Sequence, residues 1–123
     1  EQDRVQIELP VQRQTIGILP RSVWINEPIP ADVEDLEPQR ITIHHTEYPT
    51  LATNANQSVE AERLRQIRRF HVEKPPAGRG WSDIGYHFLI MPSGRVYEGR
   101  PQNKRGAHDR VNDGLGIAFD GQF

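Results

Sequence analysis

The stretch Y-H-F-L-I-M-P-S-G-R-V-Y-E, residues 86–98, predicts a β-hairpin. Aromatic and β-branched residues, which favour strands, lie on both sides of a central M-P-S-G. In that tetrapeptide Pro92 has the fixed φ that suits a turn, and Gly94 can adopt the positive φ that turns often require. We therefore expect two antiparallel strands, residues 86–90 and 95–98, joined by a tight turn.

Two further strands and one helix are predicted around this hairpin. The segment R-I-T-I-H-H-T, residues 40–46, is rich in β-branched side chains, and L-G-I-A-F, residues 115–119, predicts a last short strand. Between the first strand and the hairpin, Ser58 is expected to cap a helix that ends before Pro75. The order strand, helix, hairpin, loop, strand indicates an α/β architecture in which a helix packs on a mixed sheet.

Composition narrows the possible functions. The chain has 123 residues, which suits one domain. Its 15 Lys and Arg are balanced by 17 Asp and Glu, so the sequence lacks the excess of basic residues that is typical of nucleic-acid-binding proteins. Without cysteine, the chain can form neither a disulfide nor a thiolate metal site. No apolar run approaches the roughly 20 residues of a membrane helix, so no transmembrane segment is expected.

The neighbouring histidines His44 and His45 suggest a metal ligand. In a strand they point to opposite faces, so they cannot easily hold the same ion. By alternation His45 shares a face with Ile41 and Ile43, which we interpret as the apolar face. His45 is therefore expected to be structural and His44 to be the candidate ligand. The alternative, that His44 is an ordinary half-exposed strand residue, stays open.

The other three histidines differ in context. His71 ends an apolar helix face and is interpreted as a packing residue. His87 lies on the opposite strand face from Tyr86, so the two are not expected to act together. His108, in G-A-H, lies in a loop between elements, where binding residues are frequent.

The lead-in G-W-S-D-I-G, residues 80–85, allows two interpretations. It is either the rim of a site or a loop packed on the sheet. Trp81 suits stacking on a sugar or peptide, but also packing against the sheet. Asp83 suits a loop that is held by bonds from its carboxylate to nearby backbone N–H groups.

Six segments occur in an order that identifies a family. They are I-T-I-H-H-T, F-H-V-E-K, G-W-S-D-I-G-Y-H-F-L-I, G-R-V-Y-E-G-R, G-A-H and G-I-A-F-D-G-Q-F. Together they closely resemble the peptidoglycan recognition protein/type 2 N-acetylmuramoyl-L-alanine amidase family, which includes phage T7-type lysozyme. The resemblance covers residues 17–123 and leaves residues 1–16 as an N-terminal extension. It implies a mixed β-sheet flanked by helices.

The resemblance also implies a function. Family enzymes use zinc to hydrolyse the amide between the lactyl group of N-acetylmuramic acid and L-alanine in peptidoglycan. The first zinc-binding histidine of the family matches His44, and the catalytic tyrosine matches Tyr86. Positions that line the substrate groove match Trp81, Arg100 and His108. Such an enzyme would act in the cell envelope, periplasmic or secreted, or as a phage endolysin.

Two departures from the family keep an alternative open. The family's remaining zinc ligands follow the strand that matches residues 115–119, past the last residue, Phe123, so this chain alone is expected to be an inactive, N-terminal part of the domain. Asn112 is shifted from a family asparagine and is assigned no role. A non-catalytic recognition module is the alternative function. The disulfide of animal members is absent, which favours a bacterial or phage origin.

Overall fold

The computed structural model describes residues 17–123, so the predicted extension of residues 1–16 lies outside the described part. In chain order the elements are β1 (Ile18–Leu19), a 3-10 helix η2 (Arg21–Val23), β2 (Ile41–His45), α1 (Gln57–Val72), β3 (Phe88–Ile90), β4 (Val96–Glu98) and β5 (Leu115–Phe119). The α/β prediction is confirmed.

The five strands form one mixed sheet in the order β1-β4-β3-β5-β2. Strands β3 and β4 are antiparallel, which confirms the hairpin, and Gly94 adopts φ 95° in its turn. The other three pairings, β1 with β4, β3 with β5 and β5 with β2, are parallel. The hairpin strands are shorter than predicted, because Tyr86 and His87 precede β3 and lie in the loop before it.

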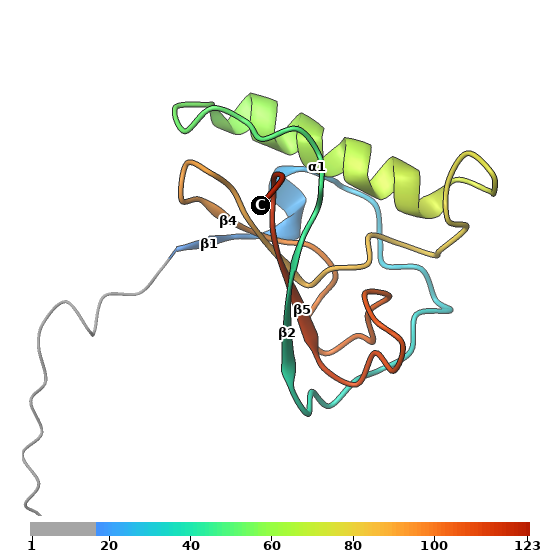
Figure 1. Cartoon of the computed structure of the whole chain (residues 1–123). Helices are drawn as coiled ribbons and strands as arrows, with labels where there is room; N and C mark the ends of the chain where they lie inside the picture. Colours follow the sequence, from blue (N-terminus) through green and yellow to red (C-terminus); the bar gives the residue numbers. More distant parts are fainter. Residues whose placement is uncertain (1–16) are drawn as a thin grey trace, which may run out of the picture.

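Helix α1 lies across one face of the sheet (Figure 1). Its Leu64 and Ile67 pack in the core with Leu89 of β3 and Ala118 of β5. The helix begins one residue before the predicted cap, Ser58, which lies inside it. Asn56 is the actual cap, since its backbone is extended and its side chain accepts a hydrogen bond from the N–H of Val59.

The apolar side of β2 is the exposed side. Ile41 and Ile43 are 62% and 59% exposed, on the face of the sheet that α1 does not cover. His44 is paired in parallel register with Ala118, a core residue, so its side chain lies on the α1 side. His44 therefore faces the interior, while His45 shares the outward face with the two isoleucines.

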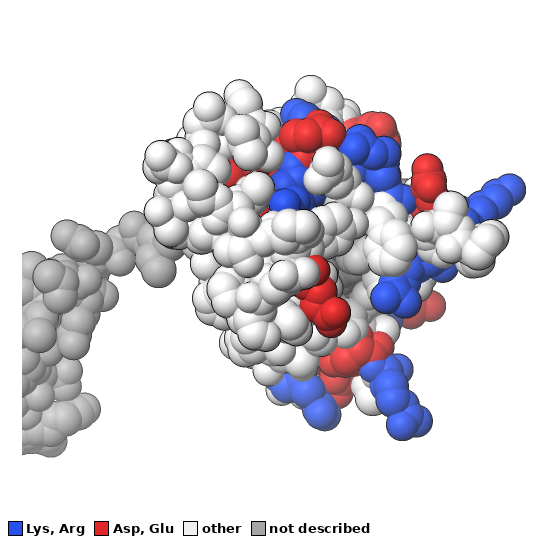
Figure 2. Space-filling model, turned by 45° about the horizontal axis from the view of Figure 1, so that its top comes forward, with Lys and Arg blue, Asp and Glu red and all other residues white. Residues whose placement is uncertain are grey.

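Charges of both signs lie close together on one face of the molecule. Figure 2 shows Lys and Arg side chains next to Asp and Glu side chains on the face in view. This agrees with the near balance of charge in the sequence. Within residues 17–123, no helix has the length and apolar character needed to cross a bilayer.

Candidate functional site

A groove of about 490 Å³ lies beside the end of α1, between the loop before β3 and the loop before β5. The residues that line it come from these three segments: His71, Arg79, Trp81, Tyr86, Ala107, His108, Asp109, Arg110 and Asn112. Three of the five predicted site residues, Trp81, Tyr86 and His108, are among them.

Five aromatic rings follow one another along this groove and into the sheet. The ring of His71 lies 4.7 Å from that of Trp81 and 5.5 Å from that of Tyr86, between centroids. Tyr86 is followed by His44 at 5.6 Å, and His44 by His108 at 5.2 Å. The structure thus joins His44 to the groove residues. His71, interpreted from the sequence as packing, belongs to the same row because its buried ring borders the groove.

Tyr86 has a free hydroxyl. Its side chain is half-buried, and burial raises its pKa above the usual value, so the phenol stays protonated at neutral pH. No hydrogen bond within residues 17–123 uses this hydroxyl, although it borders the groove. It can therefore donate to a bound ligand.

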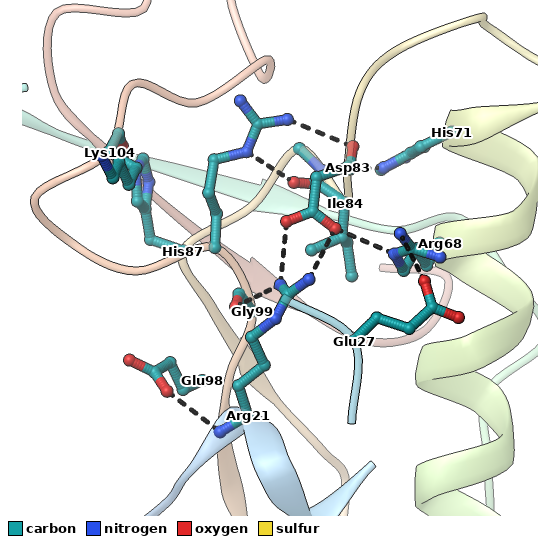
Figure 3. A network of polar contacts seen from close by, with 12 residues as sticks. Arg21, Glu27, Arg68, His71, Asp83, Ile84, His87, Glu98, Gly99 and Lys104 are labelled. Atoms are coloured by element: carbon teal, nitrogen blue, oxygen red, sulfur yellow. Dashed lines mark hydrogen bonds and ion pairs between the residues drawn. The ribbon is translucent and has the colours of Figure 1, made fainter. Parts of the chain in front are cut away.

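The loop that carries Trp81 and Tyr86 is held by buried ion pairs (Figure 3). Oδ1 of Asp83 accepts hydrogen bonds from Nη2 of Arg21 and from Nε of Arg68, both at 2.9 Å, and Oδ2 lies 2.9 Å from Nη1 of Arg21 in an ion pair. Asp83 thus holds the loop, as one interpretation of the sequence suggested. Its partners are guanidinium groups from η2 and α1, however, and not backbone N–H groups.

Arg100 does not lie in the groove, in contrast to the prediction from the resemblance. It is buried, and its three guanidinium nitrogens donate to the main-chain carbonyls of Ile84, Asp83 and Arg105. These bonds hold the backbone of the groove loop in place. The exposed arginines of the groove are Arg79 and Arg110, and the guanidinium of Arg79 lies over the ring of Trp81 at 5.4 Å.

Asn112, which was assigned no role, organises the second loop of the groove. Its Oδ1 accepts hydrogen bonds from the backbone N–H groups of His108 (2.7 Å) and Asp109 (2.9 Å). Its own φ is 55°, in the left-handed region that asparagine tolerates better than most residues. The sequence contained a signal, since asparagine is typical of turns, where its side chain bonds to nearby backbone groups and its backbone tolerates a positive φ.

A second cavity, of about 550 Å³, lies between α1 and residues 22–27 and is lined by three arginines. Each is already paired. Arg65 bonds to the Trp24 carbonyl and to Glu62, Arg68 to Asp83 and Glu27, and Arg69 to Glu62. Since these guanidinium groups have partners, we place the candidate site in the groove beside Tyr86.

The described residues do not form a complete zinc site. Within residues 17–123, no three His, Cys, Asp or Glu side chains are grouped so that they could hold a metal ion. A catalytic zinc takes three protein ligands and a water. His44 suits one of these positions, because burial, followed by the nearby His108, lowers its pKa and favours the neutral imidazole that binds metals.

Comparison with protein families supports the resemblance seen in the sequence. A family model described as N-acetylmuramoyl-L-alanine amidase matches residues 34–123. Peptidoglycan-recognition protein LE of Drosophila melanogaster is 31% identical over 99% of this chain and 36% of its own length. Peptidoglycan-recognition protein SD of Drosophila simulans is 37% identical over 88% of this chain and 56% of its own length.

An N-acetylmuramoyl-L-alanine amidase of Sus scrofa is 37% identical over 66% of this chain and 13% of its own length. The chain thus spans about half the length of the relatives it matches, or less. These relatives are animal proteins, so the predicted bacterial or phage origin stays a prediction from the missing disulfide.

Solved structures share the fold. Drosophila peptidoglycan recognition protein SD superposes with a TM-score of 0.76 at 34% identity, over 89% of this chain and 63% of that one. Peptidoglycan recognition protein LE in complex with tracheal cytotoxin, a monomeric diaminopimelic acid-type peptidoglycan, has a TM-score of 0.71 at 32% identity. That match covers 85% of this chain and 59% of the other. Human PGRP-IβC in complex with a muramyl pentapeptide has a TM-score of 0.71 at 29% identity, over 87% and 62%.

Proposed function

This chain belongs to the family of peptidoglycan recognition proteins and type 2 N-acetylmuramoyl-L-alanine amidases, and from this premise we propose that its groove binds the muropeptide part of peptidoglycan. Two structural relatives carry such ligands, a tracheal cytotoxin and a muramyl pentapeptide. The site of action is then the cell envelope or the outside of the cell, where peptidoglycan is found.

The observation that carries this proposal is the row of rings in the groove. Trp81 offers an aromatic face for a sugar ring or a peptide, and Arg79, stacked on it, offers a guanidinium for a carboxylate. His71 and Tyr86 add polar groups behind them. A ligand with a sugar, amides and carboxylates suits this set, because each kind of group has a matching partner within one groove.

We further propose that the natural protein hydrolyses the amide between the lactyl group and L-alanine. Zinc is part of this proposal, with His44 as one ligand and the other ligands outside residues 17–123. Tyr86 would donate its hydroxyl to the oxyanion of the tetrahedral intermediate, since that hydroxyl is free and close to His44. By analogy with other oxyanion donors, this contact contributes roughly 2.7–4 kcal/mol to the transition state.

Recognition without hydrolysis is the second candidate function. The observation that favours it is that residues 17–123 contain no group of three His, Cys, Asp or Glu side chains that could hold a metal ion. Many proteins of the family bear names that refer to recognition, as two of the relatives above do. Both functions use the same groove, so they differ only in whether a bound muropeptide is cleaved.

One experiment separates these functions. The chain is titrated with a defined muramyl tripeptide by calorimetry, and the natural protein is incubated with the same compound and zinc, with product analysis by mass spectrometry. Binding with release of the free peptide supports the amidase. Binding without release supports recognition, and absence of both binding and release contradicts the proposed groove.

A further inference from the structure

The ring hydrogen bonds of the histidines reveal where each carries its proton. In three of them Nδ1 accepts from a main-chain N–H: His45 from Phe123 (3.2 Å), His71 from Gly85 (2.9 Å) and His87 from Gly116 (3.0 Å). A nitrogen that accepts a hydrogen bond carries no proton. These three rings, when neutral, are therefore protonated at Nε2.

His108 is assigned by the opposite end of its ring. Its Nε2 lies 3.0 Å from the carbonyl oxygen of Gly114, and a carbonyl can only accept, so Nε2 carries the proton. In the neutral ring Nδ1 is then a bare acceptor. That nitrogen lies 3.1 Å from Nε2 of His44. His44 must therefore donate through Nε2, and its own Nδ1 is left without a proton.

A hydrogen bond donated by His108 to His44 would need a doubly protonated His108, because Nε2 of His108 already donates to Gly114. Its side chain is 0% exposed. The nearest carboxylate oxygen, Oδ2 of Asp109, is 3.6 Å from Nδ1 and is engaged by the hydroxyl of Thr42. At that distance Asp109 is outside hydrogen-bond reach of Nδ1, so it does not accept a second ring proton from His108.

The ring of His108 is held in place by two glycines. A Cβ added at Gly106 would lie 2.6 Å from Cδ2 of His108, and one at Gly116 would lie 2.5 Å from its Cγ. Only residues without side chains leave room for the ring at these positions. The close fit keeps Nδ1 of His108 directed at His44, and the chain of bonds from the Gly114 carbonyl to His44 stays in one direction.

We propose that His108 is a positioning residue that holds His44 in the Nε2–H tautomer and leaves Nδ1 of His44 as its free nitrogen. No hydrogen bond from residues 17–123 reaches this atom, whereas Nδ1 of each other histidine has a donor. The inference deepens the proposed function, on which only the last step rests: Nδ1 is the atom through which His44 would bind zinc.

Nitrogen NMR of the histidine rings tests the tautomer directly. The chain is labelled with 15N-histidine, and long-range 1H–15N spectra are recorded at pH 8 with a chelator present. We expect the pattern of a protonated Nε2 and a bare Nδ1 for His44. The signals that are missing from the spectrum of His45→Gln are those of His45. The His44 signals should be unchanged in this variant. A protonated Nδ1 in His44 would overturn the proposal.

Two substitutions at His108 test its role. His108→Ala removes the acceptor, so the His44 signals should move to averaged shifts of two exchanging tautomers. His108→Asn retains an acceptor oxygen close to the position of Nδ1, so it should restore the single tautomer at least in part. If His108→Ala is folded and His44 keeps one tautomer, His108 does not position it. If His108→Ala unfolds, the spectra of the wild type and of His108→Asn still show whether His44 is held in the Nε2–H tautomer.

Metal affinity provides a second readout in the natural protein. Loss of an outer partner of a metal-binding histidine typically weakens affinity about 10–100-fold. We expect a loss of that size for His108→Ala and a smaller one for His108→Asn, measured by competition with a chromogenic zinc chelator. Unchanged affinity in a folded His108→Ala variant would contradict the assignment. Muropeptide binding does not enter these measurements, so failure of the proposed function and failure of this inference are separable.

Discussion

Arg21 and Asp83, 62 residues apart in the chain, form a buried two-pronged ion pair. Their side chains are 9% and 0% exposed. The pair ties η2, at the start of the described chain, to the loop that carries Trp81 and Tyr86, and Arg68 of α1 binds the same carboxylate. The position of the groove loop therefore depends on an N-terminal segment that itself lines no part of the groove.

Asp83→Asn should destabilise the fold strongly. The change leaves two guanidinium groups, of Arg21 and Arg68, without their carboxylate, and breaking a buried pair typically costs about 3–5 kcal/mol. Urea denaturation followed by tryptophan fluorescence measures the loss. Glu62→Gln is the matched control, since Glu62 pairs with Arg65 and Arg69 at the surface and its loss should change little. Equal effects of the two substitutions would contradict the role of burial.

Arg100→Met and Arg79→Met should have opposite consequences. The first leaves buried carbonyls of the loop without donors, so it should lower the free energy of unfolding by several kcal/mol, at about 1–3 kcal/mol for each group. The second removes an exposed guanidinium from the groove, so it should weaken muropeptide binding with little change in stability. Calorimetric titration measures muropeptide binding by both variants, and urea denaturation measures their stability. If a folded Arg100→Met binds the muropeptide more weakly and Arg79→Met does not, Arg100 contributes to the groove, as the resemblance implied.

His44→Ala should abolish hydrolysis in the natural protein and reduce its zinc content, whereas His45→Ala should affect neither strongly. The two residues are neighbours on β2, but His44 lies on the interior side beside Tyr86 and His45 on the outward side. The pair is thus a matched test of position, and metal analysis with an amidase assay measures it. Unchanged zinc and activity in His44→Ala would remove His44 from the site.

Tyr86→Phe should separate chemistry from binding. If the hydroxyl donates to the oxyanion only in the transition state, the change should lower kcat and kcat/KM together, by about 10²–10³-fold, and leave KM nearly unchanged. Trp81→Ala should instead raise KM more than it lowers kcat, because the indole offers a surface to the ground state as well. Steady-state kinetics on a defined muropeptide measure both, and a wild-type kcat for Tyr86→Phe excludes the tyrosine from the reaction.

Mild acid should destabilise the fold through His71 and His87. Burial, the main cause in each case, lowers both pKa values to about 4, against about 6.5 in the unfolded chain. Between pH 6.5 and pH 4 the two rings bind protons in the unfolded state but not in the folded state. The free energy of unfolding is therefore highest above pH 6.5 and falls as the pH drops towards 4. By pH 5 each ring should have removed roughly 2 kcal/mol.

Urea denaturation between pH 7.5 and pH 5 measures this loss. His87→Asn, which retains an acceptor for the N–H of Gly116, should reduce the dependence on pH by about half. A stability that does not change over this range would contradict the burial of the two rings as neutral groups.

Local patterns in the sequence determined most of the secondary structure. The hairpin, β2 and β5 were predicted because strand propensity and turn chemistry depend on neighbours along the chain, and Leu115–Phe119 agrees at both ends. The cap of α1 was misplaced by two residues because Asn56 and Ser58 both suit a cap, and only the backbone conformation chooses between them. Alternation along β2 also separated His44 from His45 correctly.

The side of β2 that faces the core was decided by tertiary structure. Alternation sorts residues into two faces, but it does not reveal which face a helix will cover. Ile41 and Ile43 look like core residues, yet α1 packs on the other side of the sheet. The pairing of His44 with Ala118 depends on the order of strands, which joins segments more than 70 residues apart.

The division of labour in the site was also decided by tertiary structure. Arg100 and Arg79 are equivalent as residue types, and only burial shows that the first supports the loop while the second faces the groove. The bond between His44 and His108 joins residues 64 apart in the chain, so local patterns contain no trace of it. Residue type and spacing determined which groups were available to the site, whereas burial and long-range contacts determined which of them hold the structure and which remain free to act.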